Sequence, residues 1–144
     1  MTSIQFLHSA PDRLAAAAEW LRRAWQERQP VLVYVPDRQT AEQLDRLLWS
    51  QPATGFLPHC ARGSALADET PIVLADTLDQ PPALAHDQCL LNLADELPPG
   101  FARFETLVEI VSTSDHDRLP ARERFKFYRE RGYELTATDI GTGL

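Results

Sequence analysis

Residues 31–35 read Val31-Leu32-Val33-Tyr34-Val35, an unbroken apolar run rich in β-branched side chains. Such a run is typical of a strand buried on both faces of a parallel sheet, because a strand with one wet face alternates apolar and polar residues. Pro30 precedes the run, and Pro36 follows it. A parallel strand must be joined to its neighbours by crossovers, which are usually helices, so we expect helices on either side in the sequence.

Segments with strand and helix patterns do alternate on both sides of this run. Residues 4–8 form a short apolar run, and residues 13–28 carry apolar side chains at helical spacing. After the run, Thr40 and Gln43 predict a capping box for a helix that extends through Trp49. The strand-helix unit therefore occurs twice within the first 50 residues.

The rest of the chain continues the alternation. The further elements we expect are strands at 72–75, 88–93, 104–111 and 133–138, and a helix at 118–131 that ends at Gly132. Residues 50–68 contain several prolines and glycines and predict a short extended piece within a loop. The sequence therefore predicts one α/β domain over residues 1–144, a Rossmann-like three-layer fold with a mostly parallel sheet and helices on both faces.

Composition limits the classes of protein to which the chain can belong. It has 144 residues, of which 44% are hydrophobic, and no apolar run approaches the length of a membrane span. The N-terminus lacks the layout of a signal peptide, and the two cysteines, Cys60 and Cys89, form no CxxC unit. We therefore expect a cytoplasmic protein that contacts no membrane.

The residues predict neither a catalytic site nor a cofactor. No glycine-rich phosphate loop follows the first strand or the second. The four histidines show no metal-binding spacing, and His59-Cys60 would point apart in an extended segment. We expect a chain that is not an enzyme by itself and holds no metal. Nucleotide binding by a Rossmann-like fold without the usual glycines stays open as an alternative.

The charge is unevenly distributed. The net charge is −7, yet residues 118–131 hold six basic and two acidic side chains, a local charge of +4, so the rest of the chain carries −11. At 100° per residue Phe125 lies between the basic and the apolar stripe of this helix. The basic stripe consists of Arg118, Arg122, Lys126 and Arg129. A guanidinium fork beside an aromatic edge suits a peptide that carries both an apolar side chain and a carboxylate, such as a chain terminus.

Two other interpretations of this helix remain open. Its arginines could pair with acidic residues elsewhere on the same chain and form a solvated face. The helix could also bind nucleic acid directly, although the net charge of −11 on the residues outside 118–131 makes such binding unfavourable elsewhere on the surface.

Residues 122–133 read Arg-Glu-Arg-Phe-Lys-Phe-Tyr-Arg-Glu-Arg-Gly-Tyr. This stretch resembles the closing helix of the family of chi subunits of bacterial DNA polymerase III holoenzyme. Residues 43–50, Gln-Leu-Asp-Arg-Leu-Leu-Trp-Ser, followed by Phe56-Leu57-Pro58-His59, are similar to its "LDxxLW…F(V/L)PH" segment. The early strands fall in matching order, so the likeness covers nearly the whole chain.

The resemblance implies a function in DNA replication. Members of this family are clamp-loader accessory subunits without polymerase activity of their own, and they bind the psi subunit and the acidic, aromatic-ended C-terminal tail of single-stranded DNA-binding protein. DNA would then be reached mainly through that protein. By residue-to-residue match, the tail site would comprise Val111, Arg118, Arg122, Phe125, Lys126, Arg129 and Gly132.

The family's pattern also assigns roles within these sites. Arg122 would pair with the terminal carboxylate of the tail, while Phe125 and Val111 would wall the pocket for its last ring. Where this chain has Phe125, the family often has tyrosine or tryptophan, and a phenylalanine ring has no hydroxyl or indole N–H to donate a hydrogen bond. For psi, the resemblance points to Leu48, Trp49, Phe56, Leu57 and Pro58. Alternatively, Trp49 and Phe56 could simply fill the local core.

Overall fold

A computed structural model of the chain describes residues 2–50, 59–61, 72–78 and 88–141. Its elements are β1 (Ser3–Ala10), α1 (Arg13–Gln26), β2 (Val31–Tyr34), α2 (Arg38–Ser50), β3 (His59–Ala61), β4 (Ile72–Ala75), β5 (Cys89–Asn92), the short 3-10 helix η3 (Phe101–Arg103), β6 (Thr106–Ser112), α3 (Asp115–Glu130) and β7 (Glu134–Asp139). Each strand predicted in the described part of the chain is present.

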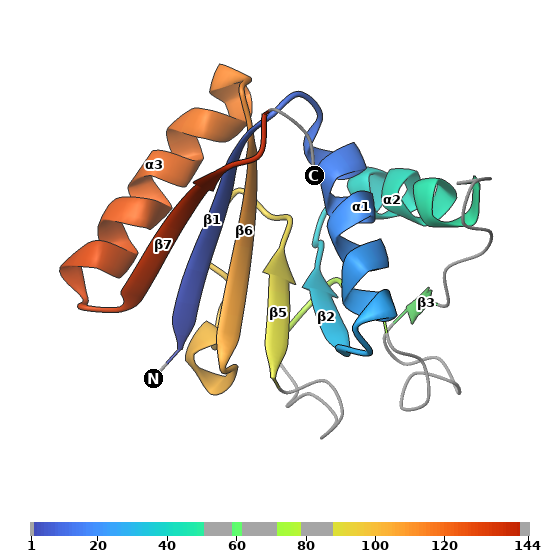
Figure 1. The fold of residues 1–144 in the computed structure, drawn as a ribbon, viewed down its shortest axis with the longest axis horizontal. Coiled ribbons are helices and arrows are strands. Elements are labelled where there is room, and N and C mark those ends of the chain that lie inside the picture. Colours follow the sequence, from blue (N-terminus) through green and yellow to red (C-terminus); the bar gives the residue numbers. More distant parts are fainter. Residues whose placement is uncertain (1, 51–58, 62–71, 79–87, 142–144) are drawn as a thin grey trace.

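The described strands form one sheet of seven, in the order β3-β4-β2-β5-β6-β1-β7. Every neighbouring pair is parallel. Helices α1 and α2 cover one face of the sheet and α3 covers the other (Figure 1). The predicted three-layer, Rossmann-like α/β fold is therefore confirmed. No helix in these described ranges is long and apolar enough to cross a membrane.

The run that predicted the parallel sheet lies at its centre. All four residues of β2 are buried, and the strand pairs with β4 on one side and β5 on the other. Successive side chains of a strand point to opposite faces, so Val31 and Val33 pack beneath α1 and α2, while Leu32 and Tyr34 pack in the core on the α3 side. β2 therefore contributes side chains to the core on each face of the sheet.

The predicted capping box of α2 is wrong. The helix begins at Arg38, three residues after Val35, and Asp37 caps it. The Asp37 carboxylate accepts hydrogen bonds from the Thr40 backbone N–H (3.0 Å) and the Thr40 hydroxyl (2.6 Å). These hydrogen bonds lower the pKa of the Asp37 carboxyl. Thr40 therefore lies in the first turn of the helix and donates hydrogen bonds to the cap, Asp37, rather than being the cap itself.

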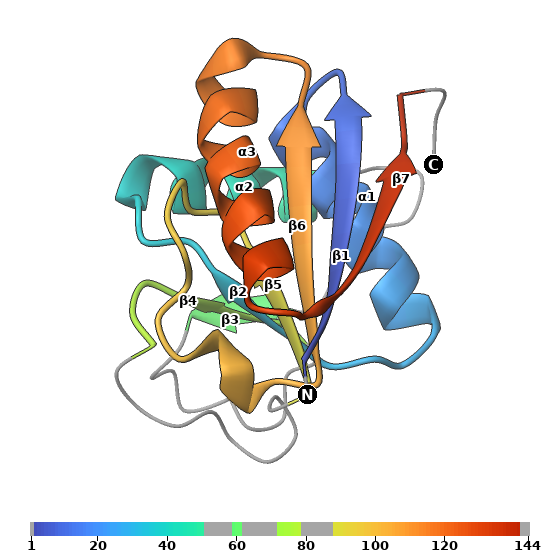
Figure 2. The same cartoon turned by 90° about the vertical axis from the view of Figure 1, so that its left-hand side faces the viewer.

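Helix α3 also begins earlier than predicted, at Asp115 instead of Arg118. The Ser114 hydroxyl accepts a hydrogen bond from the backbone N–H of His116, so Ser114 is the N-terminal cap of the helix. The predicted end is confirmed. Gly132 has a φ of +80°, the left-handed conformation that glycine adopts easily after a helix. Figure 2 shows α3 lying along β6 and β1, with β7 at the open edge of the sheet.

Candidate functional site

A pocket of about 290 Å³ opens between α3 and the carboxyl-terminal halves of β1, β6 and β7. The strands contribute Phe6, His8 and Ser9 from β1, Val111 and Ser112 from β6, and Ala137 from β7; Thr113 follows β6, and α3 contributes Arg118, Ala121, Arg122 and Phe125. Most of its surface is apolar, and its charged groups are the two guanidinium groups on α3. The shape suits one apolar side chain beside an anionic group.

The apolar walls follow from the periodicity of the elements. Phe6 and Val111 point to the α3 face of the sheet, and both are at least 95% buried. Ala121, Arg124 and Tyr128 are the buried positions of α3, and Phe125 is half-buried at their border. The rings of Phe6 and Phe125 meet edge-on with 5.1 Å between their centroids. The aromatic ring of a ligand could therefore pack against these two rings, which already contact each other.

The basic groups at the pocket differ in their availability. The Arg118 guanidinium is ion-paired with Asp115 one turn earlier on α3. The Arg129 guanidinium lies 6.0 Å from the centre of the Phe125 ring, at the limit of a cation–π contact. Arg122 is exposed, and no residue in the described ranges forms an ion pair with it. Arg122 therefore offers the pocket a free guanidinium fork.

The residues predicted for tail binding fall into two groups. Val111, Arg118, Arg122 and Phe125 line the pocket together. Arg129 contacts Phe125 from outside it, while Lys126 is exposed and Gly132 lies at the far end of α3. Seven lining residues were not predicted from the sequence: Phe6, His8, Ser9, Ser112, Thr113, Ala121 and Ala137. Alternation within residues 4–8 could have placed Phe6 on the α3 face.

Arg124 is not part of the basic surface, although it was counted among the six basic residues. Its side chain is 4% exposed and forms two hydrogen bonds of 3.1 Å with the Glu109 carboxylate, which is fully buried in β6. The hydroxyl of Tyr128 donates to the same carboxylate at 2.8 Å, and Asn92 donates at 3.0 Å. Burial, followed by the charge of Glu109, raises the pKa of the Tyr128 hydroxyl. This network ties α3 to the sheet beside the pocket.

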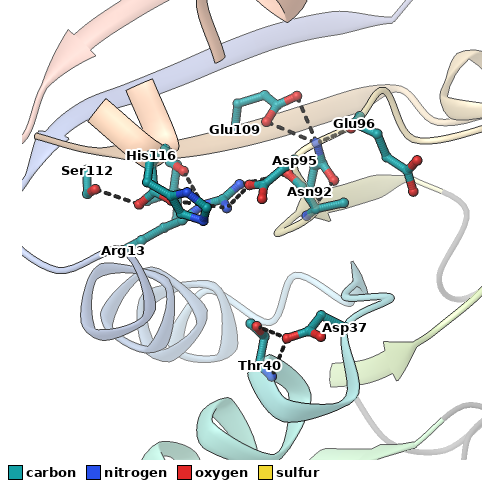
Figure 3. Close-up of polar contacts among 12 residues, drawn as sticks. Arg13, Asp37, Thr40, Asn92, Asp95, Glu96, Glu109, Ser112 and His116 are labelled. Carbon is teal, nitrogen blue, oxygen red and sulfur yellow. Dashed lines mark hydrogen bonds and ion pairs between the residues drawn. The ribbon is translucent and has the colours of Figure 1, made fainter. Parts of the chain in front are cut away.

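A second crevice lies at the carboxyl ends of β1, β2 and β5, where parallel α/β proteins commonly bind phosphates. Figure 3 shows Arg13 reaching Asp95 there, and Asp37 capping α2. The crevice is acidic, since its carboxylates are Asp12, Asp37, Asp95, Glu96 and Asp117 and its basic side chains are Arg13 and His116. Carboxylates repel phosphate, so this geometry disfavours the nucleotide-binding alternative.

The patch predicted for psi lies mostly outside the described residues. Leu48 is fully buried on α2 and packs in the core beneath α1 and α2. Trp49 belongs to α2, and Phe56, Leu57 and Pro58 lie outside the described ranges. The prediction for this patch therefore stays untested.

Comparisons with known proteins find a matching family and three related proteins. Residues 1–136 match the family described as DNA polymerase III chi subunit, HolC. The DNA polymerase III subunit chi of Pseudomonas aeruginosa is 34% identical over 126 residues, which cover 85% of this chain and 83% of the relative. The Escherichia coli protein of the same name is 31% identical over 115 residues (79% and 77%), and that of Haemophilus influenzae is 28% identical over 117 residues (81% and 80%).

Proposed function

Since this chain belongs to the family of DNA polymerase III chi subunits, we propose that it is a non-catalytic adaptor that binds the acidic C-terminal tail of single-stranded DNA-binding protein. The observation that carries the proposal is the free Arg122 fork at the mouth of an apolar, aromatic-walled pocket. A chain terminus that ends in an aromatic residue carries both matching groups, a ring and a carboxylate.

Each part of such a tail has a counterpart in the site. Its last ring would pack between Phe6, Val111 and Phe125, and its terminal carboxylate would accept two N–H groups from Arg122. Aspartates before the ring would lie near Lys126 and Arg129, which are exposed on the same helix. DNA would then be reached through the tail-bearing protein, because the −11 body repels a phosphate backbone.

Binding of the tail should weaken steeply with salt, because the carboxylates and guanidinium groups meet at a solvent-exposed rim. We expect the affinity of the chain for a short acidic peptide ending in Pro-Phe to fall about tenfold between about 0.05 M and about 0.3 M NaCl. Calorimetric titration at several salt concentrations measures it. An affinity that does not change with salt would contradict the proposed electrostatic contacts.

We also propose that the chain binds the psi subunit through the patch that begins at the C-terminal end of α2. The likeness of residues 43–50 and 56–59 to the family segment supports this assignment. Replacing both Trp49 and Phe56 with alanine is expected to weaken psi binding about thirtyfold or more, as for central aromatic residues of an interface.

Co-purification and titration with a psi subunit test this assignment. Arg122→Ala is the matched control, because α3 lies on the opposite face of the sheet from α2 (Figure 1), and it should leave psi binding unchanged. If the doubly substituted chain is folded, as its thermal melt would show, and still binds psi undiminished, then the psi site does not include this patch.

A further inference from the structure

Strand β1 contains an extra residue beside the pocket. Leu7 pairs with Ile110 and Ala10 pairs with Ser112, so two residues of β1, His8 and Ser9, face one residue of β6. Leu7 and Ala10 are three positions apart, and in a regular strand they would point to opposite faces. Both nevertheless pack in the core beneath α1 and α2. The strand therefore has a β-bulge at His8–Ser9, a feature that re-aims side chains.

The bulge is held in place by its neighbours. Ser9 has a φ of +68°, a left-handed conformation that costs a serine energy and persists only where the surroundings enforce it. The backbone N–H of Ile140 donates to the carbonyl of His8 at 2.9 Å. Gly141 approaches so closely that a Cβ there would be 2.9 Å from the carbonyl oxygen of Ser9. The end of β1 is thus fixed by the segment that follows β7.

The consequence is that His8 and Ser9 both line the pocket that also holds Arg122. The half-buried His8 ring has its Nδ1 2.8 Å from the Ser9 hydroxyl oxygen. When the hydroxyl donates to Nδ1, the ring hydrogen is on Nε2 and can be donated to a ligand. Protonation places a second hydrogen on Nδ1, which then donates to Ser9, and adds a full positive charge.

We infer that His8 is a second anion-binding residue of this pocket, which donates to a carboxylate of the bound acidic peptide and binds it more tightly when protonated. This inference rests on the proposed tail-binding function and deepens it. Arg122 alone would recognise any carboxylate at the rim. Cations on both sides, from β1 and from α3, favour a ligand with more than one carboxylate, so the preferred ligand is an acidic terminus rather than a neutral one.

The charges around His8 link its protonation to binding. Arg118 and Arg122 face the pocket from α3 and oppose a third positive charge when the pocket is empty. On β7, Asp139 is in register with His8 and favours the charge, and it is present with or without ligand. The end of β6 adds only the uncharged Ser112 and Thr113. A bound peptide carboxylate therefore supplies the change in charge that favours protonation of His8.

Peptide titrations at several pH values test this inference. We expect the unaltered chain to bind an acidic Pro-Phe peptide about fivefold tighter at about pH 5.5 than at about pH 8, the size of one partly exposed ion pair. The peptide's own carboxyl groups titrate at about pH 4 and stay ionised throughout. His8→Gln should lose this pH dependence and bind the peptide no more tightly at about pH 5.5 than at about pH 8. The matched control, His116→Gln, lies at the acidic crevice and should keep the dependence.

A second measurement uses the unaltered chain and so does not depend on the folding of a variant. Added peptide should change the NMR resonances of the His8 ring, and the change should be larger at about pH 5.5 than at about pH 8. Binding that is independent of pH, a pH dependence that persists in His8→Gln, or His8 ring resonances that do not respond to the peptide would overturn the inference alone. A complete lack of peptide binding at either pH would overturn the proposed function, and this inference with it.

Discussion

Replacing Arg122 with alanine is expected to weaken binding of an acidic peptide with a free C-terminal carboxylate by about thirtyfold, or about 2 kcal/mol. The guanidinium is the charged group at the pocket that no described residue neutralises by an ion pair. Its loss removes two charge-assisted hydrogen bonds and leaves the apolar walls intact. Fluorescence or calorimetric titration measures the change.

Two matched variants separate the geometry of Arg122 from its charge. Arg122→Lys keeps the charge without the planar fork and should bind with intermediate affinity. Arg38→Ala removes an exposed arginine that is ion-paired with Glu42 on α2, and it should bind as the unaltered chain does. If Arg38→Ala and Arg122→Ala lowered the affinity for the peptide equally, net charge rather than this pocket would determine that affinity.

Replacing Glu109 with alanine is expected to lower the free energy of unfolding by about 3–5 kcal/mol, since it leaves the buried guanidinium of Arg124 without its charge partner. Tyr128 of α3 and Asn92 of β5 also donate hydrogen bonds to the Glu109 carboxylate, and they lose this acceptor too. Urea denaturation measures the loss. The affinity for the peptide should also fall, because this network holds α3, which carries Arg122 and Phe125, against the sheet.

An exposed ion pair and a double variant control for this effect. Arg118→Ala breaks the pair with Asp115 at the surface, and it should change stability by about 1 kcal/mol or less. Replacing Glu109 and Arg124 together with leucine and methionine should restore much of the stability lost in Glu109→Ala, because no unpaired charge remains buried. A loss below about 1 kcal/mol in Glu109→Ala would show that the buried pair contributes little.

Much of the fold could be predicted because burial dictates residue type. A strand with two apolar faces, such as β2, shows no alternation, and it identifies a parallel sheet covered by helices on both sides. The starts of α2 and α3 were less predictable. Asp37 and Ser114 each stand among other residues able to cap a helix, and only the backbone geometry decides which oxygen accepts the bond.

The candidate site was predicted only in part. Helical geometry predicted that Arg122 lies beside Phe125, because this inference needs only spacing along the chain. Val111 was implied by the family resemblance alone. The burial of Arg124 could not be predicted from its position on the helix, because its partner, Glu109, lies on a strand fifteen residues earlier. Glu109, a carboxylate inside an otherwise apolar strand, could have indicated a buried ion pair, because a buried charge needs a partner. The bulge at His8 depends on pairing register, which sequence alone does not reveal.

The central claim is that this chain recognises an acidic chain terminus through Arg122 and the pocket beside Phe125. The most direct test is to titrate the chain with two versions of one acidic peptide ending in Pro-Phe, one with a free C-terminal carboxylate and one with a C-terminal amide. We predict that the amide binds at least about tenfold more weakly, because it removes the charge that Arg122 would pair with. Equal affinity for the two peptides would contradict the account.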